Sequence, residues 1–121
     1  MREMSKNIIL IGMPGSDKAA IGKIISEKLG FKFVDRREAD HDLTKFKCSV
    51  ISTGAEVVKM QADKKELRET GVVIFIDEKS QLKDEKYKIH RECCDLHLVI
   101  DNNIDEIVFY ICSLWGLKTI A

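Results

Sequence analysis

The stretch between Asn7 and Ala20, NIILIGMPGSDKAA, constrains the fold of this chain more than any other. It begins with Asn7–Ile11, a mainly apolar run rich in isoleucine that predicts a buried strand. Two glycines and a proline follow within the next five residues and are typical of a turn-forming loop. From Asp17 onward the apolar residues recur at helical spacing. The stretch therefore predicts a strand, a glycine loop and a helix in immediate succession.

This succession is typical of a phosphate-binding loop, whose sequence is Gly-x-x-x-x-Gly-Lys followed by Ser or Thr. Gly12 and Lys18 match the first glycine and the lysine. Asp17 stands at the second glycine position, and Ala19 stands at the hydroxyl position. The scaffold of a phosphate site is therefore present, while two of its chemical groups are replaced. The candidate cofactor-binding residues are Gly12, Met13, Pro14, Gly15, Ser16, Asp17, Lys18 and Ala19.

Asp17 has two interpretations. A carboxylate beside bound phosphates would repel them, at a cost of several kcal/mol for an effective dielectric constant of about 20. At the amino end of a helix, a carboxylate instead accepts hydrogen bonds from backbone amides and complements the helix dipole, each effect being worth about 1 kcal/mol. We therefore expect Asp17 to cap the helix as a built-in anion. Lys18 is then either its partner or a ligand of any phosphate that still binds.

Predicted strands and helices alternate along the rest of the chain. Apolar runs predict strands at 31–35, 48–53, 72–76 and 96–100, and helical periodicity predicts helices at 17–29, 63–70, 82–94 and 104–115. Gly30, Gly71 and Gly116 are expected to end three of the helices, and Asn103 with Glu106 is expected to start the last one. Because no hairpin signal separates the strands, we predict a five-stranded parallel sheet in a three-layer α/β/α arrangement, forming one domain over residues 1–121.

The last predicted helix carries the most continuous apolar stripe, which we interpret as core. Its members are Ile104, Ile107, Val108, Ile111, Cys112 and Trp115. At the end of this helix, Trp115 and the apolar tail 117–121 are candidates for a small contact patch.

The charge balance argues against several classes of partner. The chain has 20 basic and 20 acidic residues, so it lacks the positive charge expected of a nucleic-acid-binding domain. No apolar run approaches the roughly 18 residues of a membrane span. Residues 1–6 lack the apolar core of a signal peptide. We therefore expect a cytoplasmic protein with neither nucleic-acid nor membrane partners.

The four cysteines show no CxxC spacing. They are Cys48, Cys93, Cys94 and Cys112. Because His90 and His97 lie near the adjacent pair in sequence, a metal site is an alternative, but the pattern favours reduced thiols buried in the core. We therefore predict no metal ligands.

Three segments occur in the order in which shikimate kinases carry them: the glycine loop with its helix, Phe33-Val34-Asp35, and Ser52-Thr53-Gly54. The chain resembles this family, whose fold is the P-loop fold of nucleoside monophosphate kinases. The resemblance is closest over 8–35, continues over 50–77 and returns weakly over 87–111. It implies a transferase of aromatic amino acid biosynthesis that uses ATP and magnesium to phosphorylate shikimate.

The resemblance also implies roles for individual residues. Lys18 would contact the transferred phosphate, and Asp35 would be the catalytic base, although a carboxylate at a strand end is also typical of a turn cap. Arg37 stands at the second position of the family's Asp-x-Asp, and Lys83 aligns with an arginine that clamps the substrate. The family's glycine triplet reads Gly54-Ala55-Glu56 here. The implied substrate-binding residues are Asp35, Arg37, Gly54, Ala55 and Lys83.

Several parts of the family pattern are missing. Residues 36–47 leave no room for the family's helical substrate-binding segment, and 77–82 leave none for its arginine-bearing lid. Ala19 cannot help to hold magnesium as the family's hydroxyl does. We therefore expect a shikimate-kinase-like domain without phosphoryl transfer, acting as an interaction or regulatory module without a cofactor. Two alternatives stay open: an active kinase of shikimate or a related small molecule that uses ATP and magnesium, and a nucleotide-binding module without catalysis.

Overall fold

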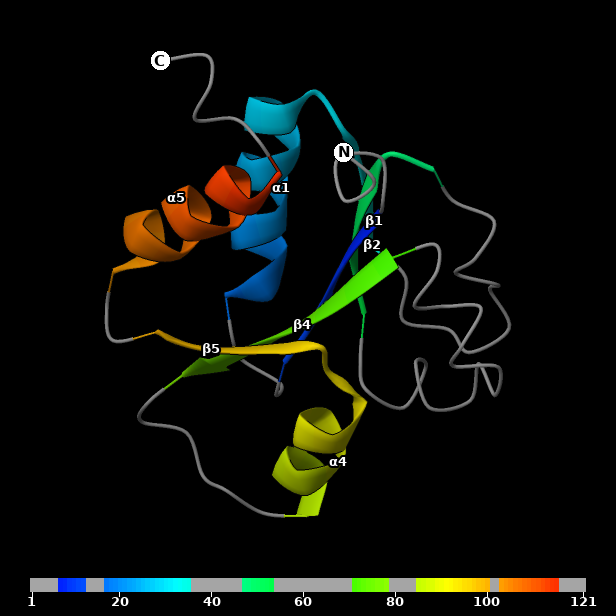
Figure 1. The fold of residues 1–121 in the computed structure, drawn as a ribbon, viewed down its shortest axis with the longest axis vertical. Coiled ribbons are helices and arrows are strands. Elements are labelled where there is room, and N and C mark those ends of the chain that lie inside the picture. The colour runs from blue at the N-terminus through cyan, green and yellow to red at the C-terminus, as the bar shows by residue number, and fades with distance from the viewer. Residues whose placement is uncertain are drawn as a thin grey trace.

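The computed structural model of the chain describes residues 7–12, 17–35, 47–53, 71–78, 85–100 and 103–115. Its elements are β1 (Asn7–Ile11), α1 (Lys18–Leu29), β2 (Lys32–Asp35), β3 (Ser49–Ser52), β4 (Gly71–Glu78), α4 (Glu85–Cys93), β5 (Leu96–Ile100) and α5 (Ile104–Leu114). The five strands form one parallel sheet in the order β2-β3-β1-β4-β5. Helices α1 and α5 lie on one face of the sheet and α4 lies on the other (Figure 1). The predicted three-layer fold is confirmed.

The central strand β1 explains why the first apolar run is so continuous. Leu10 lies opposite Ser52 of β3 on one side and Ile74 of β4 on the other. All residues of β1 are buried, because helices cover both faces of this part of the sheet. Asn7 is the polar residue at its start, and its side-chain Oδ1 accepts a hydrogen bond from the backbone N–H of Ser49 at 3.0 Å. The polar start of β1 therefore joins it to β3.

Two apolar clusters fill the two faces of the sheet. The cluster under α1 and α5 contains Ile8, Leu10, Ile21, Ile25, Val50, Ile74, Ile76, Ile100, Ile107, Val108, Ile111, Cys112 and Trp115. The cluster on the α4 face contains Ile9, Ile11, Val34, Ile51, Val73 and Phe75. The predicted stripe of the last helix is thus core, and Trp115, at 4% exposure, belongs to the core rather than to a surface contact patch.

The ends of the helices match the predictions in part. Gly30 has φ 74° and donates its backbone N–H to the carbonyl of Ser26, so it ends α1 in the left-handed conformation that glycine favours. The side chain of Asn103 accepts from the N–H of Glu106 at 3.4 Å at the start of α5. Gly116 and the helix predicted at 63–70 lie outside the described residues.

Gly71 is the first residue of β4, and the helix that it is predicted to end lies outside the described residues. Gly71 lies opposite Asn7 in the sheet. A Cβ atom at this position would lie 2.9 Å from Cδ1 of Ile9 and 3.3 Å from the carbonyl oxygen of Asn7. The close approach of β1 therefore favours glycine here, and the strand extends to Glu78, beyond the predicted 72–76.

The cysteines differ in their surroundings. Cys112 is buried, whereas Cys48 is exposed, so the prediction of core thiols is wrong for Cys48, which lies in the link between β2 and β3 with φ 48°. No group of three or more potential metal ligands occurs among the residues that the structure describes. None of the described helices has both the length and the apolar content needed to cross a membrane.

Burial raises the pKa of the Cys112 thiol above its ordinary value, and this effect outweighs the opposing effect of the nearby Lys28 ammonium. Only the thiolate attacks disulfide reagents, so we expect Cys112 to stay unmodified by Ellman's reagent at pH 8 until the protein unfolds. The Cys112→Ser variant should therefore show an unchanged number of reactive thiols when native and one fewer when unfolded. Equal reactivity of Cys112 and Cys48 in the native protein would contradict its burial. Because the folded pKa is the higher one, this thiol should also lower stability as the pH rises above the unfolded value.

Candidate functional site

The carboxyl ends of the parallel strands bring the first candidate residues to one edge of the sheet. Gly12 directly follows β1, Thr53 follows β3, and Asp35 ends β2. The backbone N–H of Thr53 donates to the carbonyl of Leu10 at 2.9 Å, which holds the ends of β1 and β3 together. Ligands of open parallel sheets bind at this edge, where the strand order reverses, and here that place lies between β1 and β3.

The amino end of α1 points toward the same edge. Asp17 occupies the position just before the helix, and its backbone carbonyl accepts the N–H of Ile21 at 2.9 Å. Its side chain makes no capping hydrogen bond, so the predicted capping role of the carboxylate is wrong. The physical reason lies in the backbone: φ −88° and ψ 25° differ from the extended conformation that directs a capping side chain onto the helix amides. Asp17 is instead an exposed residue at the start of the helix.

The next residues decide how well a nucleotide with magnesium fits. Lys18 and Ala19 are both half-buried in the first turn of α1. Gly12 and Lys18 suit a phosphate, because glycine allows close backbone approach and lysine supplies a positive charge. The methyl group of Ala19 offers no oxygen to a magnesium ion, and the exposed Asp17 adds a negative charge just before the helix. These residues therefore fit a phosphate in part and the magnesium ion poorly.

The remaining predicted residues are placed as follows. Asp35 is exposed, and β3 separates its strand from β1. Two strand spacings correspond to about 10 Å, so Asp35 lies on the same edge as Gly12 but not beside it. The other candidates lie outside the described residues, and they are Met13, Pro14, Gly15, Ser16, Arg37, Gly54, Ala55 and Lys83.

Thr53 is a polar residue at this edge that the motif analysis did not single out for chemistry. Its side chain is 1% exposed, and among the described residues its hydroxyl has no hydrogen-bond partner. A buried hydroxyl without a partner costs about 1–3 kcal/mol. Such a group next to the end of β1 is typical of a site where a ligand completes the hydrogen bond.

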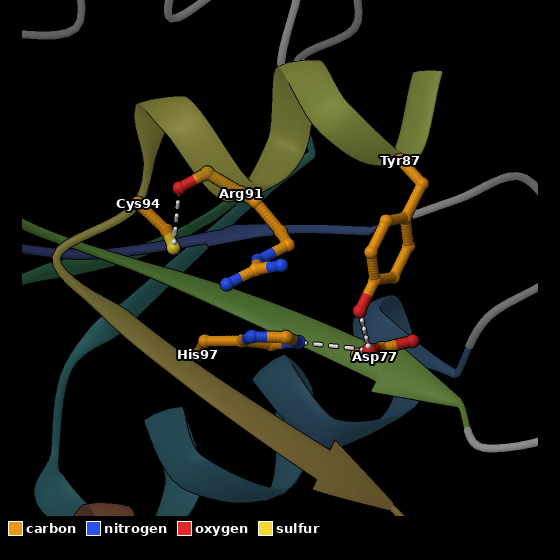
Figure 2. Close-up of polar contacts among 5 residues, drawn as sticks. All are labelled: Asp77, Tyr87, Arg91, Cys94 and His97. Atoms are coloured by element: carbon orange, nitrogen blue, oxygen red, sulfur yellow. Dashed lines mark hydrogen bonds and ion pairs between the residues drawn. The ribbon is translucent and has the colours of Figure 1, made fainter. Parts of the chain in front are cut away.

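A second polar cluster lies on the α4 face of the sheet, and Figure 2 shows it. The Oδ2 atom of Asp77 accepts a hydrogen bond from the Tyr87 hydroxyl at 2.9 Å and lies 2.8 Å from Nε2 of His97. Asp77 is 1% exposed, and 27% of the His97 side chain is exposed. The ring of Phe75 packs against both partners, with its centroid 4.8 Å from that of His97 and 5.5 Å from that of Tyr87.

Sequence reasoning missed this cluster. Side chains two residues apart in a strand point to the same face, so Phe75 and Asp77 share one face of β4. His97 of β5 lies opposite Phe75, and the His97 side chain therefore lies on the same face of the sheet. One signal was present in the sequence, because the carboxylate of Asp77 directly follows the apolar residues 72–76. The partners, however, come from three separate elements, and the register between β4 and β5 cannot be obtained from either strand alone.

Comparison with known proteins adds a sequence relationship. No protein-family model matches the chain. The shikimate kinase of Clostridium botulinum (strain Alaska E43 / Type E3) is 28% identical over 155 aligned positions, which cover 87% of this chain and 94% of the relative. Because 87% of 121 residues is about 105, about 50 aligned positions of the relative have no counterpart in this chain. The relationship therefore spans most of both proteins but skips internal segments.

Solved structures show the same fold. Shikimate kinase from Acinetobacter baumannii in complex with shikimate superposes with a TM-score of 0.67 at 16% identity, covering 98% of this chain and 97% of that one. A de novo designed protein of the P-loop NTPase fold superposes with a TM-score of 0.57 at 17% identity, covering 92% of each chain. By sequence and by fold, this chain is a relative of the shikimate kinases with the three-layer fold of a P-loop kinase.

Proposed function

We propose that this protein is a shikimate-kinase-like domain that keeps the kinase fold without transferring phosphate and acts as an interaction or regulatory module. One observation carries the proposal: the amino end of α1 presents the exposed Asp17 and the methyl group of Ala19. Phosphoryl transfer depends on positioning the phosphates and on neutralising their charge. A carboxylate and a methyl group work against both requirements.

The substrate side supports the same proposal. About 50 positions of the C. botulinum relative have no counterpart in this chain, and the segments 36–47 and 77–82 are short. Asp35, the candidate base, is exposed at the end of a strand that does not adjoin β1. A base must lie within about 3 Å of the atom that bears the proton, or reach it through one water. Within the part of the chain that the structure describes, a shikimate molecule would therefore find few groups to hold it in a reactive position.

The test is a coupled optical assay that measures the ADP formed from ATP in the presence of magnesium, with and without shikimate. We expect no shikimate-dependent ADP release above that of buffer. The Lys18→Ala variant is the matched control. The substitution would reduce activity of this protein but not the activity of a kinase carried over from the expression host. Turnover that is present in the wild-type protein and abolished in Lys18→Ala would overturn the proposal and favour the active small-molecule kinase.

The hydroxyl of Thr53 favours a second candidate function, a nucleotide-binding module without catalysis. This hydroxyl is buried beside the end of β1, where a phosphate oxygen could supply its missing hydrogen bond. Gly12 and Lys18 would contribute to the same site. Binding of ADP without any shikimate-dependent turnover would support this function over a module that binds no nucleotide.

A further inference from the structure

His97 is held in a fixed orientation by three contacts. Its Nε2 atom lies 2.8 Å from Oδ2 of Asp77. Its ring stacks on that of Phe75, with centroids 4.8 Å apart and 11° between the planes. The edge of the Tyr87 ring closes a further side, with centroids 6.0 Å apart at 72°. The imidazole therefore has little freedom to turn (Figure 2).

The hydrogen bonds of Asp77 determine which ring nitrogen of His97 carries the hydrogen. A carboxylate is an acceptor only, and Oδ2 already accepts the hydroxyl hydrogen of Tyr87. Nε2 of His97 must therefore donate to it, which leaves the lone pair on Nδ1. Within the described part of the chain, Nδ1 makes no hydrogen bond, and 27% of the side chain is exposed. A histidine oriented in this way by a buried carboxylate is typical of a base or a nucleophile.

The surroundings favour an anionic reaction partner. Figure 2 shows the guanidinium group of Arg91 pointing from α4 toward the His97 ring. Among the described residues, this guanidinium makes no ion pair. Guanidinium groups bind the oxygens of phosphoryl groups in a forked geometry. The described residues provide no set of three metal ligands here, so the lone pair is better explained as a nucleophile than as a metal ligand.

We propose that Nδ1 of His97 accepts a phosphoryl group from a small anionic donor with a nitrogen leaving group. The lone pair of Nδ1 forms a bond to phosphorus while the bond between phosphorus and the leaving nitrogen breaks. With phosphoramidate in its zwitterionic form, the leaving group departs as neutral ammonia. The product ring is a phosphorylated imidazolium, whose Nε2–H remains hydrogen-bonded to the Asp77 carboxylate.

The geometry assigns separate parts to the neighbouring residues. Asp77 positions the ring and stabilises the positive charge that the ring gains, since it is buried and therefore weakly screened. Arg91 attracts the donor. His97 lies on the edge strand β5, on the face of the sheet opposite α1. The proposed reaction at His97 therefore does not depend on whether the site at Asp17 and Ala19 has lost phosphoryl transfer. The phosphorylated protein would carry new negative charge on this face.

The experiment is incubation of the full chain with potassium phosphoramidate, followed by ³¹P NMR, intact mass and peptide mapping. We expect one acid-labile phosphoryl group per chain, located on His97, and none in the His97→Gln variant. His90 is an internal comparison, because it packs against the same Phe75 ring at 5.0 Å but is only 6% exposed. Labelling spread equally over the histidines, or absent from His97, would overturn the proposal.

Variants separate positioning from attraction of the donor. Asp77→Asn should slow labelling by phosphoramidate and by neutral diethyl pyrocarbonate, each by about 10- to 100-fold, as for other residues that orient a histidine. Arg91→Gln should slow the phosphoramidate reaction only. If circular dichroism shows that the Asp77→Asn variant does not fold, the proposal is tested by the Arg91→Gln variant and by the peptide map of the labelled wild-type protein. Equal effects of Arg91→Gln on the charged and the neutral reagent would contradict the assigned role of Arg91.

Discussion

Replacing Phe75 with alanine is expected to lower the free energy of unfolding by about 3–5 kcal/mol. Phe75 is fully buried in the middle of the sheet, in the strand adjacent to β1. Its ring contacts those of Tyr87, His90 and His97, so it joins α4 and β5 to β4. Alanine would leave a cavity among these rings and would remove the surface on which His97 stacks.

The measurement is urea unfolding followed by circular dichroism, with Phe109→Ala as the matched control. Phe109 lies in α5 and is 72% exposed, so its replacement should change the free energy of unfolding by no more than about 0.5 kcal/mol. The comparison makes the same substitution at a buried and at an exposed position. Similar losses for both variants would contradict the packing described for the α4 face.

The elements with a strong local pattern could be predicted from the sequence. The apolar run of β1 and the stripe of α5 are each set by residues close together in the chain, and burial follows from that periodicity. Gly30 and Asn103 mark helix ends through the conformations and hydrogen bonds of single residues. Alternation of these elements was enough to predict the parallel sheet, because parallel strands require long connections.

Features that depend on distant neighbours could not be predicted in the same way. The sequence around Gly71 gives no sign that Asn7 and Ile9 of β1 approach it closely in the sheet. The carboxylate of Asp17 is suited to capping by residue type, and only the backbone angles before α1 show that it does not cap. The contact between Asp77 and His97 requires the register of β4 and β5. Each of these cases is decided by tertiary geometry.

Removing the two unfavourable groups from the start of α1 should restore affinity for a nucleotide. Asp17→Gly removes the negative charge, and Ala19→Ser supplies a hydroxyl for magnesium. Repulsion of several kcal/mol corresponds to a change of 100-fold or more in the dissociation constant. Glycine costs only a few tenths of a kcal/mol at a position that precedes a helix, so the double variant should fold as the wild-type protein does.

The most direct test of the account is calorimetric titration of the wild-type protein and the Asp17→Gly/Ala19→Ser variant with ATP and magnesium. Lys18→Ala in the background of the double variant controls for binding elsewhere. We predict no measurable binding by the wild-type protein and micromolar binding by the double variant that is lost when Lys18 is removed. Micromolar binding by the wild-type protein, unchanged in the double variant, would show that Asp17 and Ala19 do not disable the loop and would contradict the account.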